Sequence, residues 1–140
     1  MLPLRDENPS RTFPAVTVLL IGANIAVFLY EFSLSPRGLD TFILSFGATP
    51  AAVLTGARAA TQHAPVPWLT LFTSMFLHAG IMHLAGNMLY LWIFGDNVED
   101  RMGPLRFFAF YVSCGVAAAL IQILMRPDST APMVGASGAI

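Results

Sequence analysis

Long runs without charged residues are the feature of this sequence that most constrains its fold. Residues 12–30 and 107–125 contain no charged side chain, and neither do residues 59–95. A helix needs about 20 apolar residues to cross the ~30 Å hydrocarbon core of a bilayer, so the first two runs each have the length of one membrane span. Only 11% of the residues are charged, against roughly 25% in soluble domains, which argues against a soluble protein.

The third uncharged run is too long for one crossing, and we expect it to divide near Gly80. Pro65 and Pro67 resist continuation of a helix near its start. The run therefore predicts a segment in or near the interface over residues 68–77 and a short spanning helix over residues 81–94. The fold expected is an all-α membrane protein, a polytopic helical bundle with about three complete transmembrane helices and the start of a fourth.

The remaining segments are predicted to be connectors. Residues 1–11 form a polar N-terminal segment. Residues 31–68 form a long loop, which is apolar enough to pack against the bilayer or the bundle. A short, charge-dense turn is expected over residues 96–106, and another over residues 126–132.

Composition and charge exclude one class of partner and favour one location. The net charge is -1 and every basic residue is an arginine, so no basic surface exists to hold a nucleic acid. A weak bias of arginines at the span ends favours a cytoplasmic N-terminus, with Ser137 toward the opposite face. We expect a multi-pass protein of a bacterial inner membrane, with the lipid bilayer as its constant partner.

Two polar residues in the predicted 81–94 helix need a partner or a purpose, because polar groups are costly in hydrocarbon. His83 and Asn87 are four residues apart, which places them on one face of a helix about one turn apart. They could hydrogen-bond neighbouring helices, as polar residues at transmembrane interfaces often do. Alternatively, they could offer hydrogen-bond donors within a dry site.

Ser137 lies between glycines in the sequence Gly135-Ala136-Ser137-Gly138. Flanking glycines permit close backbone approach and unusual dihedral angles, so this turn could present a hydroxyl together with a backbone N–H. Such a turn supplies a nucleophile and half of an oxyanion hole. The alternative is a patch of small residues that packs helices together, with the serine bonded to a backbone carbonyl.

In combination, these motifs resemble the rhomboid intramembrane serine proteases. Three segments carry the resemblance, in the family's order and with similar separations: HAGIMHLAGN from His78 to Asn87, Glu99-Asp100-Arg101, and Gly135-Ala136-Ser137-Gly138. The resemblance covers nearly the whole chain and implies that residues 12–140 are the N-terminal portion of a rhomboid protease domain. We expect the chain to be a fragment, truncated as the fourth helix begins.

The resemblance implies a catalytic role for three residues. Ser137 would be the nucleophile that attacks a peptide carbonyl. Asn87 and His83 would donate hydrogen bonds to the developing oxyanion, together with the backbone N–H of Ser137.

Supporting roles are implied for five more residues. His78 would be structural or would organise solvent, and Gly135 and Gly138 would shape the turn around the nucleophile. Glu99 and Arg101 would form a network that staples a loop, although a solvated turn accounts for these two residues equally well. The resemblance implies no metal and no organic cofactor.

The catalytic base is not in this sequence. In rhomboid proteases a histidine on the sixth helix removes the serine proton, and the chain stops before that helix. We therefore expect residues 1–140 alone to be inactive. The full-length protein is expected to be a serine endopeptidase that cleaves transmembrane or juxtamembrane segments of membrane proteins.

The sequence leaves two alternatives to a serine endopeptidase. A rhomboid-like pseudoprotease would bind membrane-protein clients without catalysis, although the joint presence of Ser137, His83 and Asn87 argues against it. A haem or metal site formed by His78, His83 and Cys114 is disfavoured, because Cys114 lies near the middle of a different predicted helix.

Overall fold

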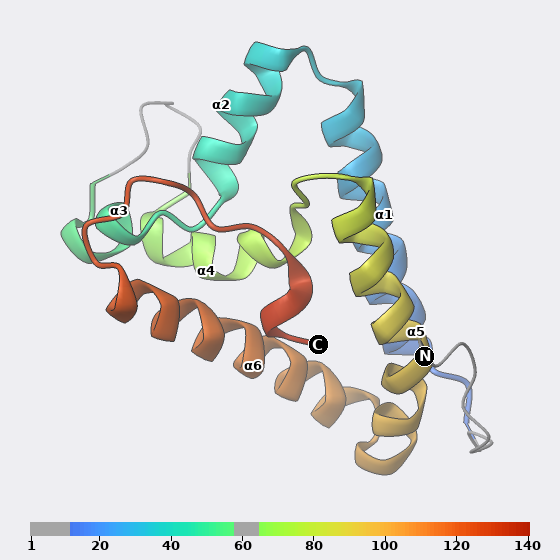
Figure 1. The fold of residues 1–140 in the computed structure, drawn as a ribbon. Helices are drawn as coiled ribbons and strands as arrows, with labels where there is room; N and C mark the ends of the chain where they lie inside the picture. Colours follow the sequence, from blue (N-terminus) through green and yellow to red (C-terminus); the bar gives the residue numbers. More distant parts are fainter. Residues whose placement is uncertain (1–11, 58–64) are drawn as a thin grey trace.

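A computed structural model describes residues 12–57 and 65–140, and three long helices dominate it (Figure 1). These are α1 (Ala15–Ser33), α5 (Ile81–Met102) and α6 (Pro104–Met125). Within the described ranges the only β pairing is an isolated bridge between Ala48 and Met133. The predicted polar segment over residues 1–11 lies outside the described residues.

The helices confirm the predicted membrane fold. Helices α1 and α6 are each long and apolar enough to cross a membrane. Helix α5 and the short helices over Pro67–Phe76 meet at an angle of 81°, and together they form a third span if the bent pair is counted as one. The chain is therefore an all-helical, multi-pass integral membrane protein with two or three candidate spans in its described part. In place of the expected start of a fourth helix, the structure has one 3-10 turn, η3 (Ala136–Gly138).

Helix α5 begins where the sequence predicted but ends much later. It starts at Ile81, directly after Gly80, and runs to Met102. The prediction that the whole of residues 96–106 forms a turn is therefore wrong. Asp, Glu and Arg side chains do not stop a helix, so residues 96–102 remain helical. The chain turns at Gly103, whose φ of 81° suits glycine, and Pro104 then opens α6 with its fixed φ.

The predicted loop over residues 31–68 also contains regular structure. Helix α1 continues through Glu31, and two more helices follow, α2 (Pro36–Phe46) and α3 (Pro50–Thr55). Each begins with a proline at its first position, where the missing N–H costs nothing. The interfacial segment over residues 68–77 is a series of short helical pieces: η1 (Pro67–Leu69), α4 (Thr70–Thr73) and η2 (Ser74–Phe76).

Helices α1 and α5 lie side by side and antiparallel (Figure 1). They approach closely at Gly95, where an added Cβ would lie 2.9 Å from Thr17 Cγ2. The face of α1 turned toward the rest of the protein buries three polar residues, spaced seven apart along the helix: Thr17, Asn24 and Glu31.

The segment after α6 runs back across the fold and places η3 against α6 and η2 (Figure 1). The bridge pins this segment, since the backbone N–H of Met133 donates to Ala48 O at 2.8 Å and the N–H of Ala48 donates in return at 3.1 Å. Ala136 and Ala139 are both buried and join the core with Met75 and Tyr111. The turn that carries Ser137 is thus held by packing on both sides.

Candidate active site

The turn around Ser137 has a backbone conformation that requires glycine. Gly135 has φ 117° and ψ 152°, a region that is essentially restricted to glycine. Its N–H donates to Ser74 O at 2.9 Å, which ties the start of η3 to η2. At the other end of the turn, a Cβ on Gly138 would lie only 2.6 Å from the Cβ of Ala118. The hydrogen bond at Gly135 and the close approach of Gly138 to α6 hold the turn in place, while the Ser137 side chain stays exposed.

The structure brings Ser137 and His83 together. Ser137 Oγ lies 3.4 Å from His83 Nε2, although the two residues are 54 positions apart in the sequence. Gly135 makes this approach possible, because a Cβ there would lie 2.5 Å from His83 Cε1 and 2.8 Å from His83 Nε2. The glycine before the nucleophile therefore provides the space in which the histidine ring sits.

His78 and Asn87 form a second pair next to the first. Both are buried, and Asn87 Nδ2 lies 3.0 Å from His78 Nε2. The rings of His78 and His83 meet edge to face, with centroids 5.2 Å apart. Four of the residues singled out from the sequence, from two separate motifs, are thus in one cluster: His78, His83, Asn87 and Ser137. The structure shows no direct contact between Asn87 and Ser137.

Glu99 and Arg101 lie far from this cluster, near the other end of α5. Glu99 is 12 residues beyond Asn87, which corresponds to about 18 Å along a helix. Its buried carboxylate accepts hydrogen bonds from Val16 N at 3.0 Å and from Thr17 N and Oγ1 at 2.8 Å each. Glu99 therefore caps the first turn of α1. Arg101 is exposed at the end of α5.

Sequence reasoning missed one residue of the cluster, Glu31. Residue 31 falls at the start of the predicted loop, whereas the structure buries Glu31 within α1 with 3% of its surface exposed. Its Oε2 accepts the backbone N–H of His78 at 3.3 Å. The seven-residue spacing of Thr17, Asn24 and Glu31 is the signal that could have placed it on the buried face.

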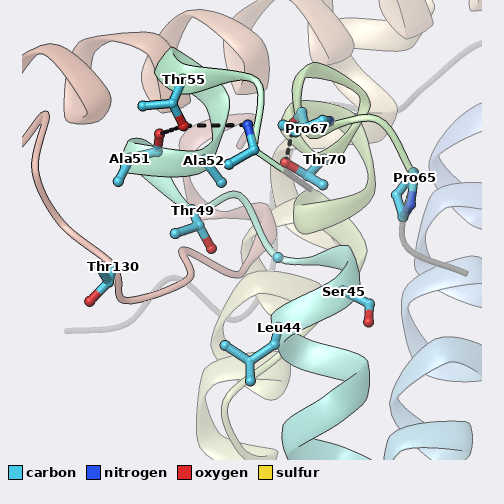
Figure 2. A pocket seen from close by; sticks show the side chains of 12 residues that line it. Leu44, Ser45, Thr49, Ala51, Ala52, Thr55, Pro65, Pro67, Thr70 and Thr130 are labelled. Carbon is cyan, nitrogen blue, oxygen red and sulfur yellow. Dashed lines mark hydrogen bonds between the residues drawn. The ribbon is translucent and has the colours of Figure 1, made fainter. Parts of the chain in front are cut away.

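Two of the cavities in the described part of the chain bear on where chemistry at Ser137 would take place. One of about 100 Å³ borders Ser137, between η2, η3 and α6, and Gln122 is its largest polar neighbour. Another of about 340 Å³ lies between α2, α3 and the segment around Pro67 (Figure 2). Its lining is mainly apolar and includes Leu44 and Thr70, but none of the four clustered residues. Chemistry at Ser137 would therefore use the smaller cavity.

The described part of the chain holds no group of three or more His, Cys, Asp or Glu side chains arranged to bind a metal ion. Cys114, on α6, is not grouped with His78 and His83 in this way. The cluster instead offers a hydroxyl with neighbouring imidazole and amide groups. Those groups suit nucleophilic attack on a carbonyl and stabilisation of the resulting negative charge.

The chain is similar to known proteins over a range that includes this cluster. The family model described as Rhomboid domain matches residues 65–140, a range that includes all four clustered residues. The rhomboid protease GluP of Bacillus subtilis (strain 168) is 35% identical over 147 residues, covering 99% of this chain and 27% of that protein. The chloroplastic Rhomboid-like protein 11 of Arabidopsis thaliana is 40% identical over 121 residues, covering 86% of this chain and 37% of that protein.

A third relative is the rhomboid protease AarA of Providencia stuartii, 32% identical over 142 residues, which covers 90% of this chain and 47% of that protein. The chain thus spans between about a quarter and a half of the length of these relatives. No solved structure matches it. With a matching family model over more than half of its length and relatives aligned over most of it, the chain belongs to the rhomboid family.

Proposed function

We propose that the full-length protein is an intramembrane serine endopeptidase that cleaves transmembrane or juxtamembrane segments of other membrane proteins, with Ser137 as nucleophile. The observation that carries this proposal is the 3.4 Å separation of Ser137 Oγ and His83 Nε2 in a helical membrane fold. Family membership supports it, because GluP and AarA are named rhomboid proteases. The arginine distribution favours a cytoplasmic N-terminus, and we propose a bacterial inner membrane as the location.

In the proposed reaction Ser137 Oγ attacks the carbonyl carbon of the scissile peptide bond. The carbonyl oxygen becomes an oxyanion, which accepts hydrogen bonds from His83, Asn87 and the backbone N–H of Ser137. The serine proton passes to a base and then to the leaving amine, and water hydrolyses the acyl-enzyme. Because His83 serves as a donor, the base is proposed to be a histidine beyond residue 140, as the family resemblance implies.

The geometry around Ser137 also favours a class of substrate. An amide within a regular helix is hydrogen-bonded and shielded, so the substrate must unwind locally before attack. Small or helix-breaking residues near the scissile bond would meet this need. The cavity of about 100 Å³ beside Ser137 suits a small side chain better than a large one.

Labelling with a serine-reactive fluorophosphonate tests the proposal on the full-length protein in detergent. Wild-type protein and the Ser113→Ala variant should be labelled equally, because the Ser113 hydroxyl is exposed on α6 and donates to Ala109 O at 2.7 Å. The Ser137→Ala variant should show no labelling. If wild-type protein is not labelled, or if Ser137→Ala is labelled as strongly as wild type, the protease proposal fails and a client-binding pseudoprotease takes its place.

A further inference from the structure

Glu31 is a buried carboxyl group that the proposed reaction does not yet use. It lies near the end of α1, with 3% of its surface exposed, in a helix that can span the membrane. An ionisable group in such a place is costly unless it is paired, and it is more often functional than incidental. Its observed partner is His78, whose backbone N–H donates to Glu31 Oε2 at 3.3 Å.

The contact between His78 and Asn87 indicates which imidazole nitrogen carries the proton. An amide nitrogen can only donate, so Asn87 Nδ2 donates to His78 Nε2 across their 3.0 Å separation. In the neutral imidazole, the acceptor nitrogen has no hydrogen, and the ring proton is therefore on Nδ1. The tautomer of the His78 ring is thus linked to the orientation of the Asn87 side-chain amide.

Four buried side-chain atoms have no hydrogen-bond partner among the described residues, and the two that belong to Glu31 and His78 complement each other. His78 Nδ1 is a buried donor in this tautomer, and Glu31 Oε1 is a buried acceptor. They belong to two residues that are already joined through Glu31 Oε2 and the His78 backbone. Burial of an unpaired donor or acceptor is costly, so one water that bridges these two atoms would remove two penalties.

We propose that Glu31 is a positioning residue that holds His78 with its proton on Nδ1, so that Nε2 accepts one hydrogen from the Asn87 amide. The second amide hydrogen of Asn87 is then fixed for the oxyanion. A carboxylate that sets the tautomer and orientation of a histidine is a known arrangement at catalytic sites. The catalytic part of this inference depends on the proposed function, whereas the tautomer of His78 does not.

The test is nitrogen NMR of the full-length protein with ¹⁵N-labelled histidine, which reports the protonated nitrogen of each ring. His78 is assigned by its loss in a His78→Gln variant. We expect wild-type His78 to be protonated on Nδ1 and to remain so in Glu31→Gln, which keeps a side-chain oxygen as acceptor. In Glu31→Leu the fixed tautomer should be lost. Protonation of wild-type His78 on Nε2 would overturn the proposal without reference to any variant.

Cleavage kinetics supply the catalytic readout. In Glu31→Leu, kcat should fall between about 10- and 100-fold with KM within about twofold of wild type, while Glu31→Gln recovers most of the rate. Asn24→Leu is the matched control, because it removes another buried polar group from the same face of α1. It should change neither kcat nor the His78 tautomer.

The two proposals fail in different ways. A wild-type protein that does not react with a fluorophosphonate refutes the protease function, and the NMR result still decides the link between Glu31 and His78. An active protein in which Glu31→Leu leaves kcat and the tautomer unchanged refutes the positioning role alone.

Discussion

Replacing Gly135 with alanine tests the close approach on which the proposed site depends. The new Cβ would lie 2.5 Å from His83 Cε1, whereas two carbon atoms in contact need about 3.5 Å. The ring or the turn must therefore shift by roughly 1 Å. In addition, a φ of 117° costs a residue with a side chain about 1–3 kcal/mol. A displacement of about 1 Å at reacting groups can reduce a rate by about 100-fold.

We therefore expect Gly135→Ala in the full-length protein to lower kcat for cleavage of a membrane-inserted peptide by about 100-fold. Fluorophosphonate labelling of Ser137 should slow in parallel. Gly86→Ala is the matched control, because Gly86 lies on the same helix as His83 and an added Cβ meets nothing within 4 Å. If Gly135→Ala cleaves within about threefold of the control while both variants unfold at the same temperature as wild type, the reasoning from close approach is refuted.

Three further substitutions separate stability from catalysis. Glu99→Ala should lower the free energy of unfolding in detergent by about 2–4 kcal/mol, because two backbone N–H groups and a hydroxyl lose their acceptor. Arg101→Ala, at an exposed position, should change it by less than about 0.5 kcal/mol, and equal losses in both variants would contradict the capping role of Glu99. Asn87→Ala should lower kcat by about 100- to 1000-fold with little change in KM. A variant that instead raises KM at unchanged kcat would show that Asn87 binds the substrate without acting on the transition state.

Helix boundaries could be predicted where backbone chemistry decides them. Gly80 marks the start of α5 and the uncharged runs locate α1 and α6, because hydrocarbon thickness sets the length of such runs. The end of α5 was missed because charged residues were taken as a helix stop, whereas Gly103 and Pro104 provide it. Helices α2 and α3 were not predicted within the expected loop over residues 31–68, although each begins with a proline, a residue that is favoured at the first position of a helix.

The sequence predicted which residues could take part in catalysis, but not which of them are in contact. The four-residue spacing of His83 and Asn87 gave their shared helix face, and the glycines around Ser137 gave an unusual turn. Neither pattern states that His83 meets Ser137, because that contact depends on the path of the segment after α6. The contact between Glu31 and His78 could not be predicted either, because the two residues are 47 positions apart and the contact depends on how α1 packs.

The polar residues of α1 have a mechanical consequence. Thr17 and Glu31 are about 21 Å apart along the helix, and their hydrogen bonds tie one end of α1 to α5 and the other end to His78, just before α5 begins. A slide of one helix past the other by a single turn, about 5.4 Å, would break both ties at once. Helices without such ties can adjust to bilayer thickness by shifting individually. We therefore expect α1 and α5 to move as one rigid body. When the thickness of the bilayer changes, the two helices tilt together, and the distance between Glu99 and Ser137 stays constant.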